Sequence, residues 1–238
     1  MIDKTFESQR LLFKPFSCLS HKEKGVVIKS WSNPFNAKYN SMNNVKKSVK
    51  DLCLRTEPTF TDLNNYYDCM CFRVAFDKIT NKIVGTCRFG VYYKLKSIDC
   101  WDFGFNVLLD YWYMGFGAEI IQAIISIAHK QGIKTIVGSA DIENLGSYKA
   151  MIKNGFEYGG RDVDGDYSYR LELNQRVKTQ KEVENNWQTH LQMTRKDLGK
   201  QRFDEIEANN KIIFDMVSRI QNGEKPKKLI VSYYKLLK

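Results

Sequence analysis

Two glycines, Gly115 and Gly117, are the residues whose spacing most directly suggests chemistry. They separate a run at 102–109 that is typical of a strand from a run at 120–130 that is typical of a helix. Glycines at such a junction, here called the glycine corner (residues 112–118), let a ligand approach the backbone, and the helix start offers free N–H groups. The pattern predicts an anion site, most naturally for a phosphate or pyrophosphate, with an ordinary strand–turn–helix corner as the alternative.

A second motif follows the predicted strand at 135–140 and opens another predicted helix. The chain contains three short patterns in this region: Trp112-x-x-Gly115-x-Gly117, Asn144-x-x-Ser147 and Lys153-x-Gly155-Phe156. Together they resemble the GNAT superfamily of acyl-CoA-dependent N-acyltransferases. The resemblance covers roughly residues 8–173 and is specific from 100 to 156. The run Leu108-x-x-Tyr-Trp112 resembles one branch in particular, the ribosomal-protein-alanine N-acetyltransferases.

This resemblance implies how acetyl-CoA would be held as a co-substrate. Backbone amides of the glycine corner would bind its pyrophosphate, namely those of Met114, Gly115, Phe116, Gly117 and Ala118. Strand backbone at Val107, Leu108 and Leu109 would pair with the pantetheine arm. Asn144 would contact that arm as well, although its side chain could instead cap the following helix. Many family members carry a basic residue inside the glycine loop, where this chain has Tyr113 and Met114.

The resemblance also implies catalytic roles. Asp102 is the predicted general base, because many relatives carry a strand glutamate near this position, and a carboxylate there could accept the amine proton directly or through water. An exposed carboxylate on an alternating strand is the alternative. Ser147 would donate a proton to the leaving sulfur. Some GNAT enzymes use a tyrosine at the position of Met151, so Tyr111, or else Tyr148, would replace it as a proton donor.

Composition limits the class of protein. The chain has 238 residues, of which 43% are hydrophobic and 27% charged, as in ordinary globular proteins of one or two domains. Apolar runs are too short to span a membrane, and the N-terminal residues lack the apolar core of a signal peptide, so we expect a cytoplasmic protein. Six cysteines without a C-x-x-C pair, and three histidines, make a zinc or other metal site unexpected.

The predicted elements indicate the α/β class, and the resemblance implies a mixed, mostly antiparallel sheet flanked by helices. Strands are expected at 7–15, 71–76, 83–91, 100–109, 135–140 and 166–173, and helices near 20–24 and at 45–54, 120–130 and 148–154. We assign residues 1–175 to the GNAT domain. Residues 176–238 form a C-terminal extension with predicted helices at 178–198 and 201–221 and a short strand at 229–233. Its apolar stripe should dock on its own domain or on a partner protomer.

Three functions are compatible with the sequence. The first is an N-acetyltransferase that acts on a primary amine, such as a protein N-terminus, a lysine or a small amine, as a monomer or homodimer. The second is a GNAT enzyme that modifies a nucleic acid or ribonucleoprotein. The extension carries +6 of the net charge of +10, which would favour weak contact with a polyanion, unless this charge serves only solubility. The third is a non-catalytic acyl-CoA-binding protein.

Overall fold

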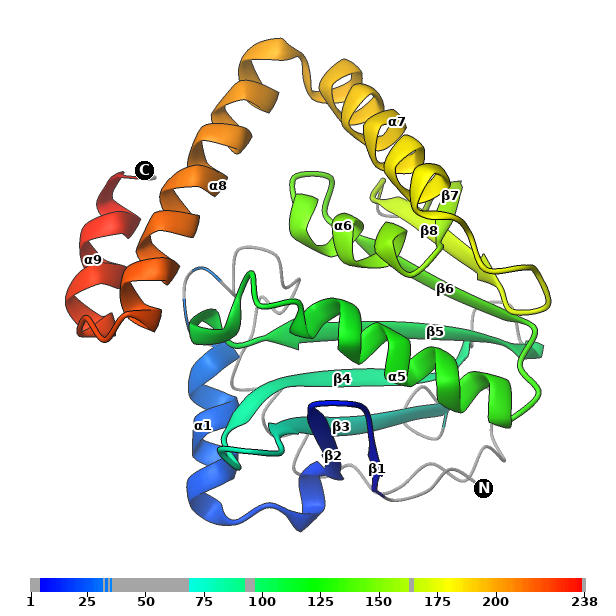
Figure 1. Ribbon diagram of the computed structural model, residues 1–238, viewed down its shortest axis with the longest axis horizontal. Helices are drawn as coiled ribbons and strands as arrows, with labels where there is room; N and C mark the ends of the chain where they lie inside the picture. Colours follow the sequence, from blue (N-terminus) through cyan, green and yellow to red (C-terminus); the bar gives the residue numbers. More distant parts are fainter. Residues whose placement is uncertain are drawn as a thin grey trace.

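The central feature is a sheet of eight strands in the order β1-β2-β3-β4-β5-β6-β8-β7, counted over the described residues (Figure 1). The computed structural model describes residues 5–31, 33, 35, 69–92, 97–162 and 165–236. The strands are β1 Phe6–Glu7, β2 Leu11–Pro15, β3 Met70–Asp77, β4 Ile83–Tyr92, β5 Ser97–Val107, β6 Thr135–Ala140, β7 Glu157–Arg161 and β8 Tyr167–Glu172. All neighbouring strands are antiparallel except β5 and β6, which confirms the predicted α/β class and mixed sheet.

Helices cover both faces of this sheet. The elements are η1 Phe16–Cys18, α1 His21–Trp31, η2 Leu109–Tyr111, α5 Phe116–Lys130, α6 Leu145–Lys153, α7 Gln180–Leu198, α8 Lys200–Gln221 and α9 Pro226–Leu236. Residues alternate between two cores along β3, with Cys71 and Ala75 in the core under α5 and α6. Val74 and Phe76 pack on the other face with Trp31 of α1. Within the described residues, no helix is both long and apolar enough to cross a membrane.

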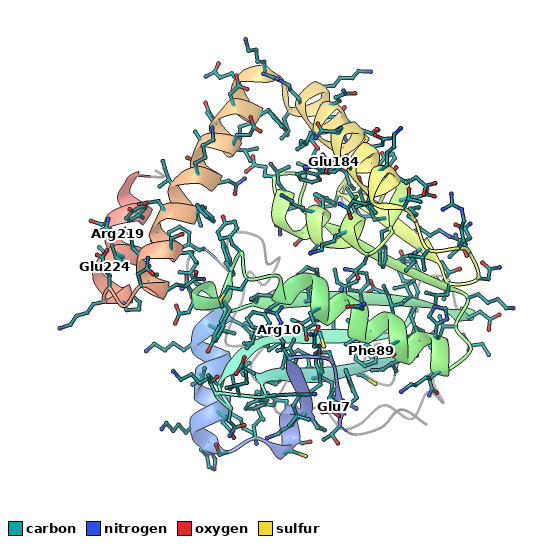
Figure 2. The ribbon with its side chains drawn as sticks, in the orientation of Figure 1. Glu7, Arg10, Phe89, Glu184, Arg219 and Glu224 are labelled. Atoms are coloured by element: carbon teal, nitrogen blue, oxygen red, sulfur yellow. The ribbon has the colours of Figure 1, made fainter. Side chains whose placement is uncertain are left out.

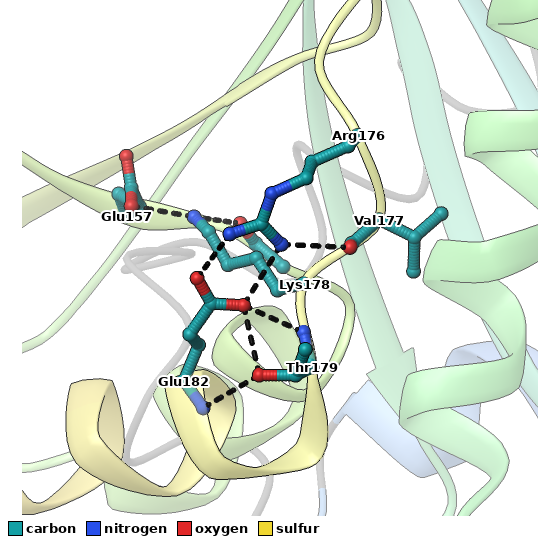
Figure 3. Close-up of polar contacts among 7 residues, drawn as sticks. Glu157, Arg176, Val177, Lys178, Thr179 and Glu182 are labelled. Carbon is teal, nitrogen blue, oxygen red and sulfur yellow. Dashed lines mark hydrogen bonds and ion pairs between the residues drawn. The ribbon is translucent and has the colours of Figure 1, made fainter.

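The C-terminal extension folds back onto the sheet domain, one of the two arrangements that the sequence predicted (Figure 1). Its two long helices, α7 and α8, match the predicted ranges, and Gly199 separates them with φ of 79°. Figure 3 shows the start of α7, where Thr179 and Glu182 form a capping box. Beside it, Lys178 Nζ lies 2.6 Å from Glu157 Oε1 of β7, which ties the helix to the edge of the sheet.

Several predicted elements were wrong. The expected strand at 229–233 is part of helix α9, because Leu229 and Tyr233 stand one turn apart and both bury against α8, and packing overrides their strand propensity. The expected strand at 7–15 is two strands joined by a turn. Strand β7 was missed because it is exposed and contains two glycines. The predicted helix at 45–54 lies outside the described residues.

Candidate functional site

The central strands part in the middle of the sheet. Strands β5 and β6 pair only through Cys100–Thr135, Trp101–Ile136 and Asp102–Val137. Beyond Asp102, β5 follows β4 and β6 follows β8. We call the diverging segments, residues 103–107 and 138–140, the fork.

Backbone groups of β5 face this fork. The Leu108 N–H donates to the Val84 carbonyl of β4 at 2.8 Å. Because hydrogen-bonded pairs alternate along an antiparallel ladder, the N–H and C=O groups of Phe103, Phe105 and Val107 point away from β4 and toward the fork. The Val107 carbonyl there accepts a hydrogen bond of 2.7 Å from Trp112 Nε1.

These contacts correct two predicted site residues. Leu108 lies beyond the end of β5, and its amide is already bonded to β4. Leu109 begins η2, and its side chain is buried in a cluster with α8 and α9. Neither residue fits the predicted role of pairing with a pantetheine arm. The Val107 N–H does face the fork and fits that role.

The glycine corner lies where the fork meets helix α5. Gly115 precedes the helix with φ of 80°, a left-handed conformation that favours glycine. A Cβ on Gly117 would lie 3.0 Å from the Phe105 ring, so this glycine lets the helix pack closely on β5. Because α5 begins at Phe116, the amides of Phe116, Gly117 and Ala118 have no partner within the helix, and Met114 lies exposed just before them. These N–H groups have the arrangement that binds anions at other helix N-termini.

A positive charge reaches this corner from the turn between β1 and β2. Arg10 Nη1 donates to the Met114 carbonyl at 3.1 Å, and its guanidinium carbon lies 4.0 Å from the centre of the Phe116 ring. Figure 2 shows Arg10 beside α5. Arg10 Nε also pairs with Glu119 Oε2 of that helix at 2.6 Å. Sequence reasoning missed Arg10 because its contact with Met114 forms when the β1–β2 turn docks on α5, and no local sequence pattern specifies that docking.

Glu119 fixes the position of Arg10. Its carboxylate accepts hydrogen bonds from Ser8 Oγ at 2.6 Å and from the Arg10 backbone N–H at 2.7 Å. Burial acts to raise the pKa of Glu119, but these hydrogen bonds and the Arg10 guanidinium outweigh it and hold the pKa below its ordinary value. Glu119 therefore stays ionised, and the arginine is held at the corner.

Asp102 lies at the vertex of the fork, on the face opposite α5. Its neighbours Trp101 and Phe103 are buried under α5, so alternation turns the carboxylate toward the α1 face. Asp102 Oδ2 lies 2.6 Å from Arg88 Nη1 of β4. The carboxylate is thus present at the predicted place, where it forms an ion pair with Arg88.

Asn144 and Ser147 stand on the β6 side of the fork, at the start of α6. The Ser147 backbone N–H donates to Asn144 Oδ1 at 3.2 Å, so Asn144 caps the helix, which is the alternative that its sequence context left open. Ser147 is half-buried in the first turn. The cap places both residues after the end of β6, across the fork from the glycine corner.

The two candidate tyrosines differ in access. Tyr111 is half-buried in η2, with its ring edge-on to Phe116 at 5.8 Å. Burial, followed by the charges of Asp110 and Asp77, raises its pKa, so its hydroxyl remains protonated at neutral pH. Tyr148 is buried, and its hydroxyl donates to the Ala140 carbonyl. Tyr148 is therefore a core residue and does not fit the role of a proton donor. Within the described ranges, no group of three metal-ligating side chains comes together.

Comparison with known proteins gives the family of this site. A family model described as the acetyltransferase (GNAT) domain matches residues 10–157, which is more than half of the chain. The match includes the fork, the glycine corner and Arg10, and it ends before the C-terminal extension. A search of curated protein sequences gave no match.

Solved structures with the same fold include three acetyltransferases. A GNAT-family acetyltransferase from Bacillus anthracis is 18% identical, with 72% of this chain and 99% of that chain covered and a TM-score of 0.55. A ribosomal L7/L12 α-N-protein acetyltransferase in complex with coenzyme A is 13% identical, with 69% of this chain and 95% of that chain covered and a TM-score of 0.52. An aminoglycoside acetyltransferase in complex with coenzyme A and kanamycin is 13% identical, with 74% and 98% covered and a TM-score of 0.52.

These likenesses establish the fold, and the family model extends over the part of the chain that builds the fork and the glycine corner. Both agree with an α/β architecture in which a mixed, mostly antiparallel sheet parts between two central strands. The chain belongs to the GNAT acetyltransferase family.

Proposed function

We propose that this protein transfers an acetyl group from acetyl-CoA to a primary amine, by direct attack within a ternary complex. The observation that carries the proposal is the meeting of the fork with the glycine corner, which sets strand backbone and a helix N-terminus side by side. A pyrophosphate fits the amides of residues 114–118. Arg10, at the same corner, supplies the positive charge that the loop itself lacks.

The reaction requires a polarised thioester, a neutral amine and a proton for the leaving sulfur. The pantetheine arm would enter the fork with its thioester oxygen at the Val107 N–H, and this hydrogen bond would stabilise negative charge on that oxygen during attack. The amine nitrogen forms a bond to the carbonyl carbon, and the C–S bond then breaks. Ser147 or Tyr111 would protonate the departing thiolate, since both are hydroxyls at the edges of the fork. Alignment of amine and thioester would contribute much of the rate.

Asp102 would take the amine proton through a water molecule. Its carboxylate lies at the vertex of the fork on the α1 face, opposite the face that α5 covers. The ion pair with Arg88 competes for one carboxylate oxygen and leaves the other to accept a hydrogen bond. An intervening water also compensates for the shorter side chain of aspartate relative to glutamate.

The chemical identity of the acceptor amine is a separate step of this proposal. Resemblance to the ribosomal-protein-alanine branch favours a protein N-terminus. The solved structures above include one relative named for a ribosomal protein and one bound to an aminoglycoside, so a lysine or a small polyamine belongs in the same test. Fold alone does not select among these amines.

The test is a thiol-release assay with acetyl-CoA and a panel of N-terminal peptides, polyamines and aminoglycosides, with the product mass measured. We expect one class of amine to gain an acetyl group. The Gly115→Glu variant is the matched control, because a carboxylate at the corner repels phosphate, and it should lose both CoA binding and turnover. Tight CoA binding by the wild type without turnover on any amine would instead favour a non-catalytic acyl-CoA-binding protein.

A further inference from the structure

Helix α8 connects the two sides of the fork. At its first turn, Arg202 Nη2 lies 2.6 Å from Glu143 Oε1, in the loop between β6 and α6. At its last turn, the Gln221 side-chain amide donates to the carbonyls of Asp110 and Trp112, at 3.2 and 3.1 Å. Figure 1 shows the helix descending from α7 to the segment just before α5. The extension therefore contacts the glycine corner as well as the far side of the fork.

One face of α8 meets the glycine corner through an aromatic pair. Asn210, Phe214 and Gln221 are spaced by four and seven residues, so they share this face. The Asn210 carbonyl accepts a hydrogen bond from the Tyr113 hydroxyl at 3.4 Å. The rings of Tyr113 and Phe214 meet edge to face, with centroids 5.0 Å apart and planes at 78°.

This pair is unusually exposed for aromatic side chains. Tyr113 is 52% exposed and Phe214 53%, and Met114 beside them is 45% exposed. Tyr113 also adopts φ of 62°, a left-handed conformation that is uncommon for a bulky residue and that fixes where its ring points. Exposed apolar surface gathered at one place commonly marks a binding site.

We propose that Tyr113 and Phe214 form an aromatic shelf for the adenine base of acetyl-CoA, so that the C-terminal extension completes the co-substrate site. The inference rests on the proposed function. In CoA the adenosine is joined to the pyrophosphate through one ribose, so a pyrophosphate at the glycine corner brings the base next to Tyr113, which lies two residues before Gly115. Purines stack on aromatic side chains through their π-faces. Lys211, exposed and three residues before Phe214, adds positive charge nearby.

The shelf predicts a preference for free acyl-CoA over carriers that lack the nucleotide. Calorimetry with CoA and with 4′-phosphopantetheine measures this preference, because both ligands carry the same arm and at least one phosphate, while only CoA has adenine. Wild-type protein should bind CoA more tightly. Phe214→Ala should weaken CoA binding by roughly 5- to 150-fold, the range of one lost base–aromatic stack, and leave phosphopantetheine binding unchanged.

Two controls separate stacking from loss of folding. Phe214→Tyr keeps a ring and should keep the CoA preference, while Val231→Ala removes an exposed apolar side chain from α9 and should change neither affinity. An equal affinity of the wild type for both ligands would overturn the shelf while leaving the proposed function intact. An equal loss of affinity for both ligands in a folded Phe214→Ala variant would overturn it as well. Failure of the wild type to bind either ligand would overturn the proposed function itself.

Discussion

Two contacts between the extension and the sheet domain, one on α7 and one on α8, differ in character. Helix α7 buries His190, which is 1% exposed, against the rings of Tyr148 and Trp187, at 4.5 and 5.4 Å between centroids. The His190 Nδ1 shares a hydrogen bond of 2.8 Å with the Tyr169 hydroxyl. Helix α8 instead leaves the ring of Phe214 half in solvent. The first contact has the character of a core, and the second has that of a rim around a ligand.

One extension would thus stabilise the fold through α7 and, in our proposal, complete the co-substrate site through α8. Burying polar groups such as an imidazole costs free energy unless they are hydrogen-bonded, and α7 satisfies this requirement inside an aromatic cluster. An exposed aromatic pair contributes little to folding and is useful mainly when something covers it. Loss of the exposed Phe214 ring should therefore reduce ligand binding, and loss of the buried His190 ring should reduce stability.

The largest expected effect is on turnover, from a substitution at the vertex of the fork. Asp102→Asn should lower turnover by roughly 10²–10⁴-fold, the range for a lost general base, with little change in CoA affinity. Turnover at saturating acetyl-CoA and calorimetry with CoA are the two measurements. A variant within a few-fold of the wild type would show that water or Tyr111 handles the proton without this carboxylate.

Shortening the buried side chain of His190 on α7 tests the stabilising role of that helix. His190→Ala should lower the free energy of unfolding by about 3 kcal/mol, because it leaves a cavity among aromatic rings and an unpaired Tyr169 hydroxyl. Phe214→Ala should lower it by about 1 kcal/mol at most, since only half of that side chain is buried. Urea unfolding compares the two variants, and equal losses would contradict the contrast between α7 and α8.

Acid should lower the stability of the protein through the same residue, His190. Burial lowers the pKa of His190 from 6.5 to about 4, so the unfolded chain binds a proton in this interval that the folded chain does not. Its contribution is present above pH 6.5 and is lost as the pH falls toward 4, by about 3 kcal/mol in total. The wild type should therefore lose more stability than His190→Gln between pH 7 and 4. Parallel curves for the two proteins would show that the imidazole is not the titrating group.

A smaller effect is expected at Arg10. Arg10→Gln should weaken CoA binding by about tenfold, the effect of one charge-assisted contact, and Arg10→Lys should restore part of that loss. Pantetheine, which has no phosphate, should bind both variants and the wild type alike. If pantetheine binding falls as well, Arg10 acts by holding the loop and not by meeting the phosphate.

Sequence patterns predicted the features that depend on neighbouring residues. The strand–helix junction at Gly115 and the break at Gly199 are each set within a few positions of the chain. The cap at Asn144 is equally local, but the sequence offered it only as the alternative to a contact with the pantetheine arm. The features that the sequence did not predict depend on how the strands pair. Whether the Leu108 amide faces a ligand or β4 depends on strand pairing, which a local pattern does not specify. In α9, β-branched and aromatic residues favoured a strand until burial against α8 decided otherwise.

The contact between Arg10 and Glu119 joins residues 109 positions apart. Contacts so distant in sequence form slowly, since the intervening chain must first be ordered. The glycine corner thus acquires the Arg10 guanidinium only when the first two strands have docked, and the phosphate binding that we propose there would be a property of the finished molecule. We expect CoA to slow unfolding in a stopped-flow experiment while leaving the refolding rate unchanged, so that in the cell the co-substrate would protect mature protein and not chains still folding.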